Sequence, residues 1–324
     1  MAASMSRCKL RILLKKYDNR HVLKLLSNSY TVESGYQNNG SSKKKTHFGF
    51  QSVTEEEKEE KVYSVFKNVA DKYDLMNDAM SGGIHRLWKD HFIRRLNPKQ
   101  GTKLIDVAGG TGDIAFRFLK YACTENNGNL NDFDFTSDFS AEDFEMPDFE
   151  SEQLLGNQEH TSHVTVCDIN QSMLEVGQGR ASQAGINQGI SWLKGNAESL
   201  PVQDNTFDAY TIAFGIRNCT HIDKVVEEAY RVLKPGGRFM CLEFSRVPNP
   251  LIRRVYDEYS FQVIPVLGQI LASDWDSYKY LVESIRQFPC QEDFKTLIQT
   301  CGFSAVTYEN LTFGVVAIHS GFKL

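Results

Sequence analysis

The chain of 324 residues lacks the features that would place it among membrane-spanning, disulfide-bonded or nucleic-acid-binding proteins. No run of about 18 apolar residues occurs, which excludes a hydrophobic spanning helix. The seven cysteines are odd in number and form no C-x-x-C motif, so we expect reduced thiols and no metal centre. The net charge is −5, and the body of the chain has no basic surplus, so no nucleic acid is expected as a partner.

Two segments have a strongly unbalanced charge: one has few acidic residues, and the other has no basic ones. Residues 1–47 carry ten Lys and Arg but only two acids, and residues 122–163 carry eleven acids and no Lys or Arg. The first segment interleaves basic and leucine residues and is predicted to be a mitochondrial transit peptide, with a disordered basic tail or a membrane-binding surface helix as alternatives. The second has five Phe among its acids and fits no helix or strand period. It is predicted to be a flexible acidic insert, and a partner-docking motif is the alternative.

The most informative stretch is LIDVAGGTGDIA, residues 104–115. It predicts a buried strand over 103–108, a turn with Gly109, Gly110 and Gly112, and a helix that starts at Asp113. Glycines let the backbone turn tightly and approach a ligand, toward which the free amides of the helix start point. By itself the turn fits a methyltransferase, a dinucleotide-binding dehydrogenase or a structural turn without a ligand.

Beyond the insert, strands and helices alternate. This alternation predicts an α/β domain over residues 48–324, interrupted by the insert, with a Rossmann-like, mostly parallel sheet of seven strands and helices on both faces. The last two strands are expected to close as a reversed hairpin. The further predicted strands are 163–168, 190–193, 207–214, 238–244, 304–308 and 313–319, and the predicted helices are 62–80, 85–96, 113–121, 171–184, 222–233 and 291–300, with a turn at 235–237.

Two strand ends carry side chains suited to a nucleoside. Asp168 ends the second strand, about 20 residues past the glycine turn once the insert is removed, where a ribose-binding acid belongs. The alternative is that Asp168 caps the next helix. After the third strand, Asn196 offers a donor and an acceptor for an adenine edge while Ala197 leaves room for the ring. An ordinary polar loop is the alternative for this pair.

Several longer motifs occur in the order expected of one family. The motifs are VFKNVADKYDLMNDAMSGGIHRLWK (65–89), LIDVAGGTGDIA (104–115), NAESLP (196–201), FGIRNCTH (214–221), RVLKPGGRFMCLEFS (231–245), YDEYSFQVIPVLGQ (256–269), DSYKYLVESIRQFP (276–289) and LTFGVVAIHSG (311–321). Together they resemble the ubiquinone/menaquinone-biosynthesis C-methyltransferases, which are class I S-adenosylmethionine-dependent methyltransferases. The likeness covers about residues 55–121 and 163–324.

The resemblance implies a set of residues that bind S-adenosylmethionine. Two positions depart from the family pattern: Ala213 replaces a frequent serine, and Cys290 interrupts the common FPDQ stretch and is given no role. The implied set is Thr111, Asp168, Asn196 and Ala197, with Gly109, Gly110 and Gly112 in the turn.

The resemblance further implies methylation at a ring carbon of a 2-methoxy-6-polyprenyl-1,4-benzoquinol. The substrate must be the reduced quinol, because a quinone ring is electron-poor. We expect Arg217 to stabilise the phenolate or orient a water, and Asn218 to fix the geometry. A salt bridge from Arg217 to an acid such as Glu243 is the alternative. Three candidates remain for accepting the phenolic proton: a water, His85 and Asp168.

The remaining expectations concern surroundings and alternatives. An apolar stretch from Tyr259 to Tyr278 is expected to form the channel for the polyprenyl tail or, equally, a core helix. The resemblance implies peripheral binding on the matrix side of the mitochondrial inner membrane, other ubiquinone-biosynthesis proteins in a multi-subunit complex, and a possible homodimer. The alternative functions are demethylmenaquinol methylation, a cofactor-binding scaffold and, least favoured, a nicotinamide dehydrogenase.

Overall fold

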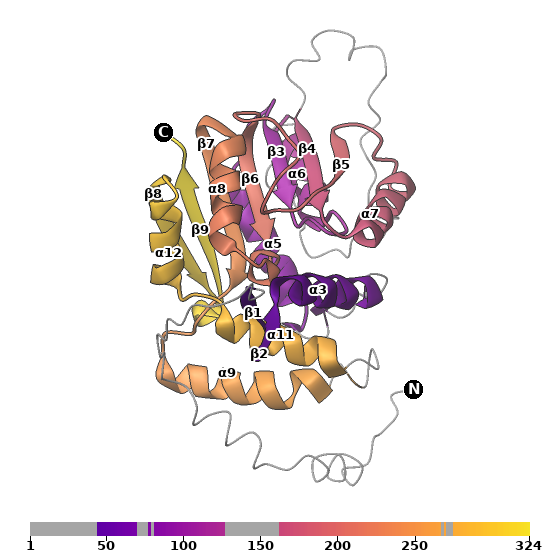
Figure 1. Ribbon diagram of the computed structural model, residues 1–324. Helices are drawn as coiled ribbons and strands as arrows, with labels where there is room; N and C mark the ends of the chain where they lie inside the picture. Colours follow the sequence, from indigo (N-terminus) through magenta and orange to yellow (C-terminus); the bar gives the residue numbers. More distant parts are fainter. Residues whose placement is uncertain (1–43, 70–76, 79–80, 127–161, 267–268, 270–274) are drawn as a thin grey trace. The chain divides into compact units, whose positions relative to one another are not determined.

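The computed structural model describes residues 44–69, 77–78, 81–126, 162–266, 269 and 275–324. Its centre is a seven-stranded sheet with the order β5-β4-β3-β6-β7-β9-β8 (Figure 1). Neighbours among β3 to β7 pair in parallel, and β9 runs antiparallel to both β7 and β8. This confirms the predicted sheet and its reversed hairpin. The strands are β3 (Lys103–Val107), β4 (His163–Asp168), β5 (Ile190–Lys194), β6 (Phe207–Ala213), β7 (Leu233–Phe244), β8 (Ser304–Leu311) and β9 (Val316–Phe322).

Helices cover both faces of the sheet because its strands are apolar on both sides. In β3, Leu104 packs into a core cluster with residues of α5, α6 and α7, and the next residue, Ile105, packs into a second cluster with residues of α8 and α12. Successive side chains of a strand point to opposite faces, so one apolar run serves both layers. The helices are α5 (Ile84–Leu96), α6 (Asp113–Asn126), α7 (Gln171–Gln183), α8 (Ile222–Val232) and α12 (Gln291–Thr300).

A further group of elements lies beyond the carboxyl ends of the parallel strands (Figure 1). It comprises the hairpin of β1 (Lys45–Phe48) and β2 (Gln51–Thr54), followed by α3 (Glu55–Val69), and the two helices α9 (Pro250–Gln262) and α11 (Trp275–Gln287). Helix α11 packs on the short helix η4 (Ile216–Asn218), which follows β6. These elements therefore surround the edge of the sheet where ligands of α/β folds bind.

The structure corrects the expected turn at 235–237. The β7 strand already begins at Leu233, which pairs with Phe207, and the ladder resumes at Arg238 opposite Ala209. The extra residues form an irregularity inside the strand, and Gly236 takes a φ of 82°, a backbone conformation that glycine adopts at little cost. The β1–β2 hairpin was not predicted, and its first residues overlap the leader expected over 1–47. Residues 1–43 of that leader and 127–161 of the insert lie outside the described residues.

Two further features of the described residues concern their helices and their thiols. None of its helices is both long and apolar enough to cross a membrane. Cys167 and Cys241 are buried in strands as free thiols, and burial raises the pKa of the Cys167 thiol to about 12, so that thiol is protonated and unreactive.

Buried charges tie α5 to α6 beneath the glycine turn. Asp90 has no exposed surface and forms an ion pair with Arg117, whose Nε also donates to Asp113 Oδ1 at 2.9 Å. Lys89 Nζ lies 2.5 Å from Asp113 Oδ2. Charges this deeply buried are tolerated because each has a counter-charge.

We expect Arg117→Met to lower the free energy of unfolding by about 3–5 kcal/mol, because Asp90 would stay buried without its counter-charge. Urea unfolding measures the change. Arg95→Met is the matched control: it removes an ion pair to Glu309 in which the arginine is 56% exposed, and it should cost less than about 1 kcal/mol. Equal losses of unfolding free energy in the two variants would contradict the role of Arg117 as the counter-charge of the buried Asp90.

Candidate functional site

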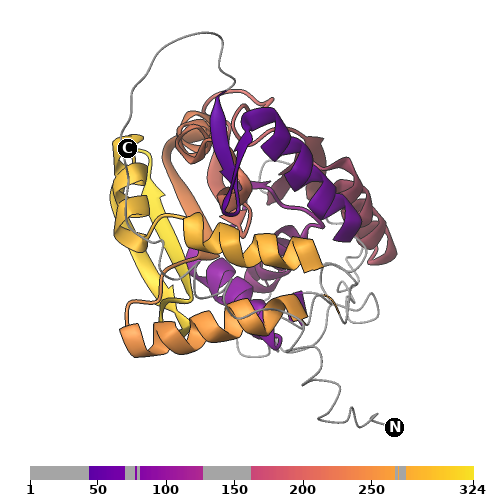
Figure 2. The same cartoon turned by 60° about the horizontal axis from the view of Figure 1, so that its bottom comes forward.

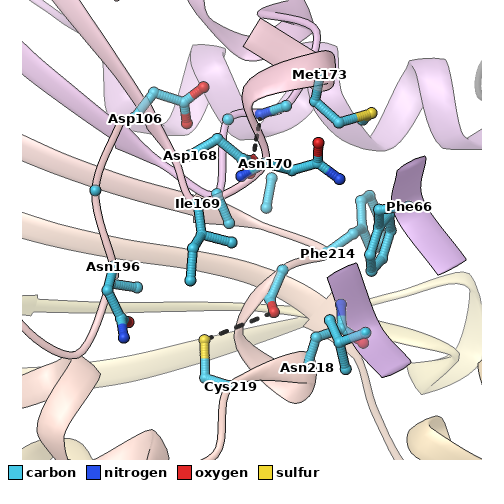
Figure 3. Close-up of a pocket in the computed structure, with 18 of the residues that line it drawn as sticks. Phe66, Asp106, Asp168, Ile169, Asn170, Met173, Asn196, Phe214, Asn218 and Cys219 are labelled. Carbon is cyan, nitrogen blue, oxygen red and sulfur yellow. Dashed lines mark hydrogen bonds between the residues drawn. The ribbon is translucent and has the colours of Figure 1, made fainter. Parts of the chain in front are cut away.

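A pocket opens at the carboxyl edge of the sheet, around the ends of β3, β4, β5 and β6 (Figure 3). The strand order reverses there, because β4 and β5 extend the sheet on one side of β3 while β6 and β7 extend it on the other. Loops that leave such a switch point diverge and form a crevice. Of the predicted residues, those that line the pocket are Gly109, Gly110, Thr111, Asp168, Asn196, Ala197 and Asn218.

The glycine turn after β3 forms one wall of the pocket. Gly112 N donates to the Gly109 carbonyl at 2.9 Å, and Gly110 and Gly112 have φ values of 55° and 85°. A Cβ on Gly109 would lie 2.7 Å from Asp106 Oδ2, and one on Gly112 would lie 2.8 Å from the Trp192 ring. The turn therefore requires glycine at positions 109 and 112, because a side chain at either one would clash with its neighbours. Gly112 packs against Trp192 rather than lining the pocket.

Asp168, at the end of β4, is fixed by backbone amides. Its Oδ2 accepts the N–H of Gly110 at 2.9 Å, and its Oδ1 accepts the N–H of Asn170 at 2.8 Å. Burial raises the pKa of the Asp168 carboxyl, and these hydrogen bonds oppose the rise. The capping role considered for Asp168 belongs to its neighbour, because Asn170 Oδ1 accepts the N–H of Ser172 at the start of α7.

The loop after β5 presents Asn196 and Ala197 to the opposite side of the pocket. Asn196 Oδ1 accepts the N–H of Glu198 at 2.9 Å, so its oxygen holds the loop in shape. Glu198 in turn accepts backbone N–H groups of Thr220 and His221 at 2.7 and 2.9 Å. The loop after β5 is thereby tied to the segment after η4, and both shape the same crevice.

Asp106 is a pocket residue that the sequence analysis missed. It is fully buried in β3, its Oδ1 accepts the hydroxyl of Thr211 at 2.8 Å, and its Oδ2 has no hydrogen-bond partner. Burial raises the pKa of the Asp106 carboxyl to about 7. The available signal was a single acid in an otherwise apolar strand, which is unusual because a buried charge is costly. Lys89 and Asp113, ion-paired to each other, line the pocket nearby and were also missed.

Arg217 lies behind the pocket wall and does not line it among the described residues. Its Nη1 donates to Glu243 Oε1 at 2.9 Å and to the Phe214 carbonyl at 2.5 Å. Both members of the Arg217–Glu243 pair are buried, and the guanidinium also lies 5.5 Å from the centre of the Phe244 ring. The salt bridge considered as the alternative for Arg217 is thus present. The role expected for Arg217 in stabilising the phenolate stays a prediction, with the side chain held next to the pocket lining rather than in it.

Asn218 does line the pocket, and a residue from α11 holds it in place. The hydroxyl of Tyr280 donates to Asn218 Oδ1 at 3.0 Å, and the Tyr280 ring stacks on Phe48 of β1 with centroids 4.0 Å apart. Tyr280 is buried, which raises the pKa of its hydroxyl, so the group is a hydrogen-bond donor. The orientation of Asn218 thus depends on two elements far from it in sequence.

Helix α3 covers one side of the pocket with Glu59, Val62, Tyr63 and Phe66. It is attached at its first turn, where Glu55 Oε1 lies 3.1 Å from His221 Nε2, while Glu198 Oε2 lies 2.7 Å from Nδ1 of the same ring. The His221 imidazole therefore links α3 both to the loop after β5 and to the segment after η4, which border the pocket.

Some expected residues are not brought to the pocket. His85 does not line it among the described residues, and burial together with Lys89 lowers the pKa of this histidine to about 4. In the apolar stretch from Tyr259 to Tyr278, Ile264 and Tyr278 pack instead into a separate core cluster with Val282. Leu267, Ile270 and Leu271 of that stretch lie outside the described residues. Within the described part of the chain, no three His, Cys, Asp or Glu side chains gather as metal ligands.

Comparison with known proteins places the chain among relatives over most of its length. The model of the ubiE/COQ5 methyltransferase family matches residues 54–323. A protein from Bos taurus named "2-methoxy-6-polyprenyl-1,4-benzoquinol methylase, mitochondrial" is 59% identical over 280 residues, which is 86% of this chain and 84% of that protein. The protein of the same name from Danio rerio is 53% identical, and the alignment covers 100% of both chains.

A solved structure shares the fold at low sequence identity. It is a SAM-dependent methyltransferase from Thermotoga maritima, described as a possible histamine N-methyltransferase. It has a TM-score of 0.50 and 17% identity, and it covers 81% of this chain and 100% of its own. At this identity the likeness concerns the fold alone.

We expect Asp106→Asn to stabilise the protein more at pH 8 than at pH 5. The pKa of Asp106 is higher in the folded than in the unfolded state, so the folded protein binds more protons between about pH 4 and 7 and loses stability as pH rises through that window. The substituted asparagine retains an acceptor for the Thr211 hydroxyl and carries no charge. The gain in unfolding free energy should be larger at pH 8 by on the order of 2–3 kcal/mol. Urea unfolding at both pH values measures it, and equal gains would contradict the raised pKa.

Proposed function

This chain belongs to the ubiE/COQ5 methyltransferase family, and from that premise we propose that it methylates a ring carbon of 2-methoxy-6-polyprenyl-1,4-benzoquinol in ubiquinone biosynthesis. The chain is an S-adenosylmethionine-dependent methyltransferase. The observation that carries the proposed substrate is the 53% identity over complete chains to a relative with that name. An intact glycine turn and a buried acid at the pocket wall are what a working enzyme of this class requires.

The pocket fits S-adenosylmethionine, which supplies a methyl group activated on a sulfonium. The glycine turn leaves space that a Cβ on Gly110 would fill, since that atom would lie 3.1 Å from Met173 Cε and 4.0 Å from Asp168 Oδ2. We propose that Asp168 accepts the ribose hydroxyls and that Thr111 contacts the cofactor beside the turn. Because Asn196 Oδ1 already holds its own loop, we propose that its Nδ2 donates to the adenine edge, over Ala197.

The acceptor must be a reduced ring because its carbon has to be electron-rich enough to attack the electrophilic methyl group. A phenolic proton has a pKa of about 10, so at neutral pH the site has to stabilise the phenolate or accept the proton as the methyl group arrives. Transfer would break the carbon–sulfur bond of the bound cofactor and form a carbon–carbon bond, after which the ring carbon would lose its own proton. The protein's contribution is alignment of the ring with the methyl group and a favourable electrostatic environment.

We propose that Asn218 contacts the quinol and that Arg217 acts on it from behind the wall. The guanidinium cannot serve as a base because its pKa exceeds about 12. Glu243 and the Phe214 carbonyl hold the guanidinium of Arg217, which precedes Asn218 in η4, and from there it would favour negative charge on the ring oxygen. His85 is a weak base in this fold, with a pKa of about 4, and it lies outside the pocket lining. A bound water or Asp168 is then the proton acceptor.

We further propose the surroundings in which this reaction takes place. Both relatives named above are described as mitochondrial, and we place the chain in the mitochondrion, with a transit peptide that lies within residues 1–47 and ends before β1. A polyprenyl substrate resides in the bilayer, which favours peripheral binding at the matrix side of the inner membrane. A multi-subunit assembly with other ubiquinone-biosynthesis proteins and a homodimer complete the proposal, as expected from the family resemblance.

The test is transfer of a labelled methyl group from S-adenosylmethionine to a short-tailed methoxy-benzoquinol, with and without reductant. We expect label on a ring carbon only when the substrate is reduced, because the oxidised ring lacks the electron density for attack. A rise in the melting temperature when S-adenosylmethionine is added is the control, because it shows that the site is folded and binds the cofactor. A bound cofactor with no transfer to the quinol would contradict the proposed function and favour the scaffold.

Substitution of Arg217 separates its electrostatic role from its structural one. Arg217→Gln should lower kcat by about 100-fold or more. It should also destabilise the fold by about 3–5 kcal/mol because Glu243 loses its counter-charge. The affinity for S-adenosylmethionine should change less than about twofold, since Arg217 does not line the pocket. Adding Glu243→Gln should restore the unfolding free energy but not kcat. Recovery of kcat in the double variant would show that Arg217 is purely structural.

A further inference from the structure

The two ends of the Asn218 side-chain amide have different surroundings. Its Oδ1 accepts the hydroxyl of Tyr280 at 3.0 Å and is, among the described residues, the one acceptor of that proton. Its Nδ2 has no hydrogen-bond partner in the same part of the chain. Asn218 lines the pocket, whereas Tyr280 is not among the described residues that do. The donor end of the amide is therefore the end that remains available to a ligand.

The direction of this hydrogen bond decides which end of the amide meets the acceptor ring. A side-chain amide is an acceptor at its oxygen and a donor at its nitrogen. With Oδ1 of Asn218 held by Tyr280, Nδ2 can donate to a ring oxygen, and such a donor favours the phenolate. A reversed amide would point Oδ1 at that oxygen and repel its negative charge. A phenylalanine at position 280 would fill the same space without selecting the orientation.

The β1–β2 hairpin holds the Tyr280 ring in turn. Phe48 of β1 stacks on this ring with centroids 4.0 Å apart and an interplanar angle of 8°. Lys61 of α3 lies over the Phe48 ring, with Nζ 5.3 Å from its centroid. Figures 1 and 2 show the indigo hairpin beside α3 and in contact with the orange helix α11. Stacking fixes the plane of the Tyr280 ring and with it the position of the hydroxyl.

The turn of the hairpin is anchored on the same helix. Phe50 N donates to Oε2 of the buried Glu283 of α11 at 3.1 Å. Gly49 has a φ of 57°, and a Cβ on it would collide with the Glu283 carboxylate. Glycine at the first of two turn residues is what a type II′ hairpin requires. Tyr280 and Glu283 are three residues apart and lie on one face of α11, so the hairpin contacts both.

We propose that Tyr280 and Phe48 are positioning residues of the methyl transfer. Phe48 holds the Tyr280 ring, and the Tyr280 hydroxyl keeps Asn218 Nδ2 directed at an oxygen of the acceptor ring. Both residues act through Asn218 and do not touch the substrate. The proposal rests on the proposed function, in which Asn218 contacts the quinol. It gives a role to a hairpin of which all but Thr54 precedes residues 54–323, the span that the family model matches.

The experiment measures transfer of a labelled methyl group from S-adenosylmethionine to a reduced, short-tailed methoxy-benzoquinol by variants of the full chain. Tyr280→Phe keeps the stacked ring and removes the hydroxyl. We expect its kcat to fall by about tenfold, the effect of one hydrogen bond that strengthens as charge develops on the ring oxygen. Its KM for the quinol and its affinity for S-adenosylmethionine should change by less than about twofold, because ground-state binding does not depend on that charge.

Variants of Phe48 test whether the hairpin acts through the Tyr280 hydroxyl. Phe48→Leu removes the stack and should lower kcat by about threefold to fivefold, whereas Phe48→Tyr keeps an aromatic ring there and should retain most of kcat. The double variant Tyr280→Phe/Phe48→Leu should be no slower than Tyr280→Phe, because the ring position no longer matters once the hydroxyl is gone. Losses of kcat that multiply in the double variant would overturn the proposed route from Phe48 to Asn218.

Tyr121→Phe is the matched control. The hydroxyl of Tyr121 donates to Asn97 Oδ1 at 3.1 Å, so this variant loses a hydrogen bond of the same kind. Neither residue is among the described residues that line the pocket, and kcat should equal that of the unmodified chain. A rise in melting temperature with S-adenosylmethionine shows that each variant is folded and binds the cofactor.

The outcomes separate failure of this proposal from failure of the proposed function. An unchanged kcat in Tyr280→Phe, measured beside an active unmodified chain, would refute the positioning role and leave the methyltransferase assignment intact. Absence of methyl transfer by the unmodified chain would refute the proposed function and this role with it. A lower kcat in Tyr280→Phe at unchanged KM, with Tyr121→Phe unaffected, supports the positioning of Asn218 by Tyr280.

Discussion

The hydrogen bond from the Gly110 amide to Asp168 is the contact on which the site depends. It joins the turn after β3 to the end of β4 with an N–O distance of 2.9 Å. It forms because Gly110 adopts a positive φ and because nothing larger than hydrogen occupies the turn. The carboxylate of Asp168 is thereby held at the switch point of the sheet. The pocket proposed to bind the cofactor is arranged around that position, as are helix α3, which covers it, and the wall that contains Asn218.

Buried ion pairs lie next to the pocket at the carboxyl edge of the sheet and support its wall. The Arg217–Glu243 and Lys89–Asp113 pairs both lie at or just beneath the pocket wall, and each is largely withdrawn from water. Such pairs contribute little net stability, but removal of one partner is costly, so they fix geometry more than they add strength. Asp106 is the exception, because one of its oxygens is buried without a partner. An unsatisfied acid beside a ligand site is a feature that functional sites tolerate and core packing does not.

Much of the fold could be predicted from the sequence because its strands are short apolar runs that end in polar loops. The bounds of β4 and α12 were predicted without error, and the residues proposed to bind the cofactor follow strand ends, where a local sequence pattern is enough to single them out. The partners of Arg217 and Asn218 were harder. The Arg217–Glu243 pair was anticipated only as an alternative. The Tyr280–Asn218 bond, between residues 62 apart, depends on how α11 packs. The apolar stretch from Tyr259 to Tyr278 was predicted to form a channel or a core helix, yet Tyr259 and Val263 are exposed. Periodicity shows that a face is apolar but not which way it points.

A crystal structure with S-adenosylhomocysteine would show directly whether Asp168 anchors the cofactor. That product has the nucleoside and amino-acid parts of the cofactor without the transferable methyl group, so it reports where the cofactor lies. We expect the ribose hydroxyls to lie within hydrogen-bond distance of the Asp168 carboxylate, with the adenine over Ala197 and the sulfur directed toward Asn218. A nucleoside bound away from Asp168, or a sulfur directed away from Asn218, would contradict this placement.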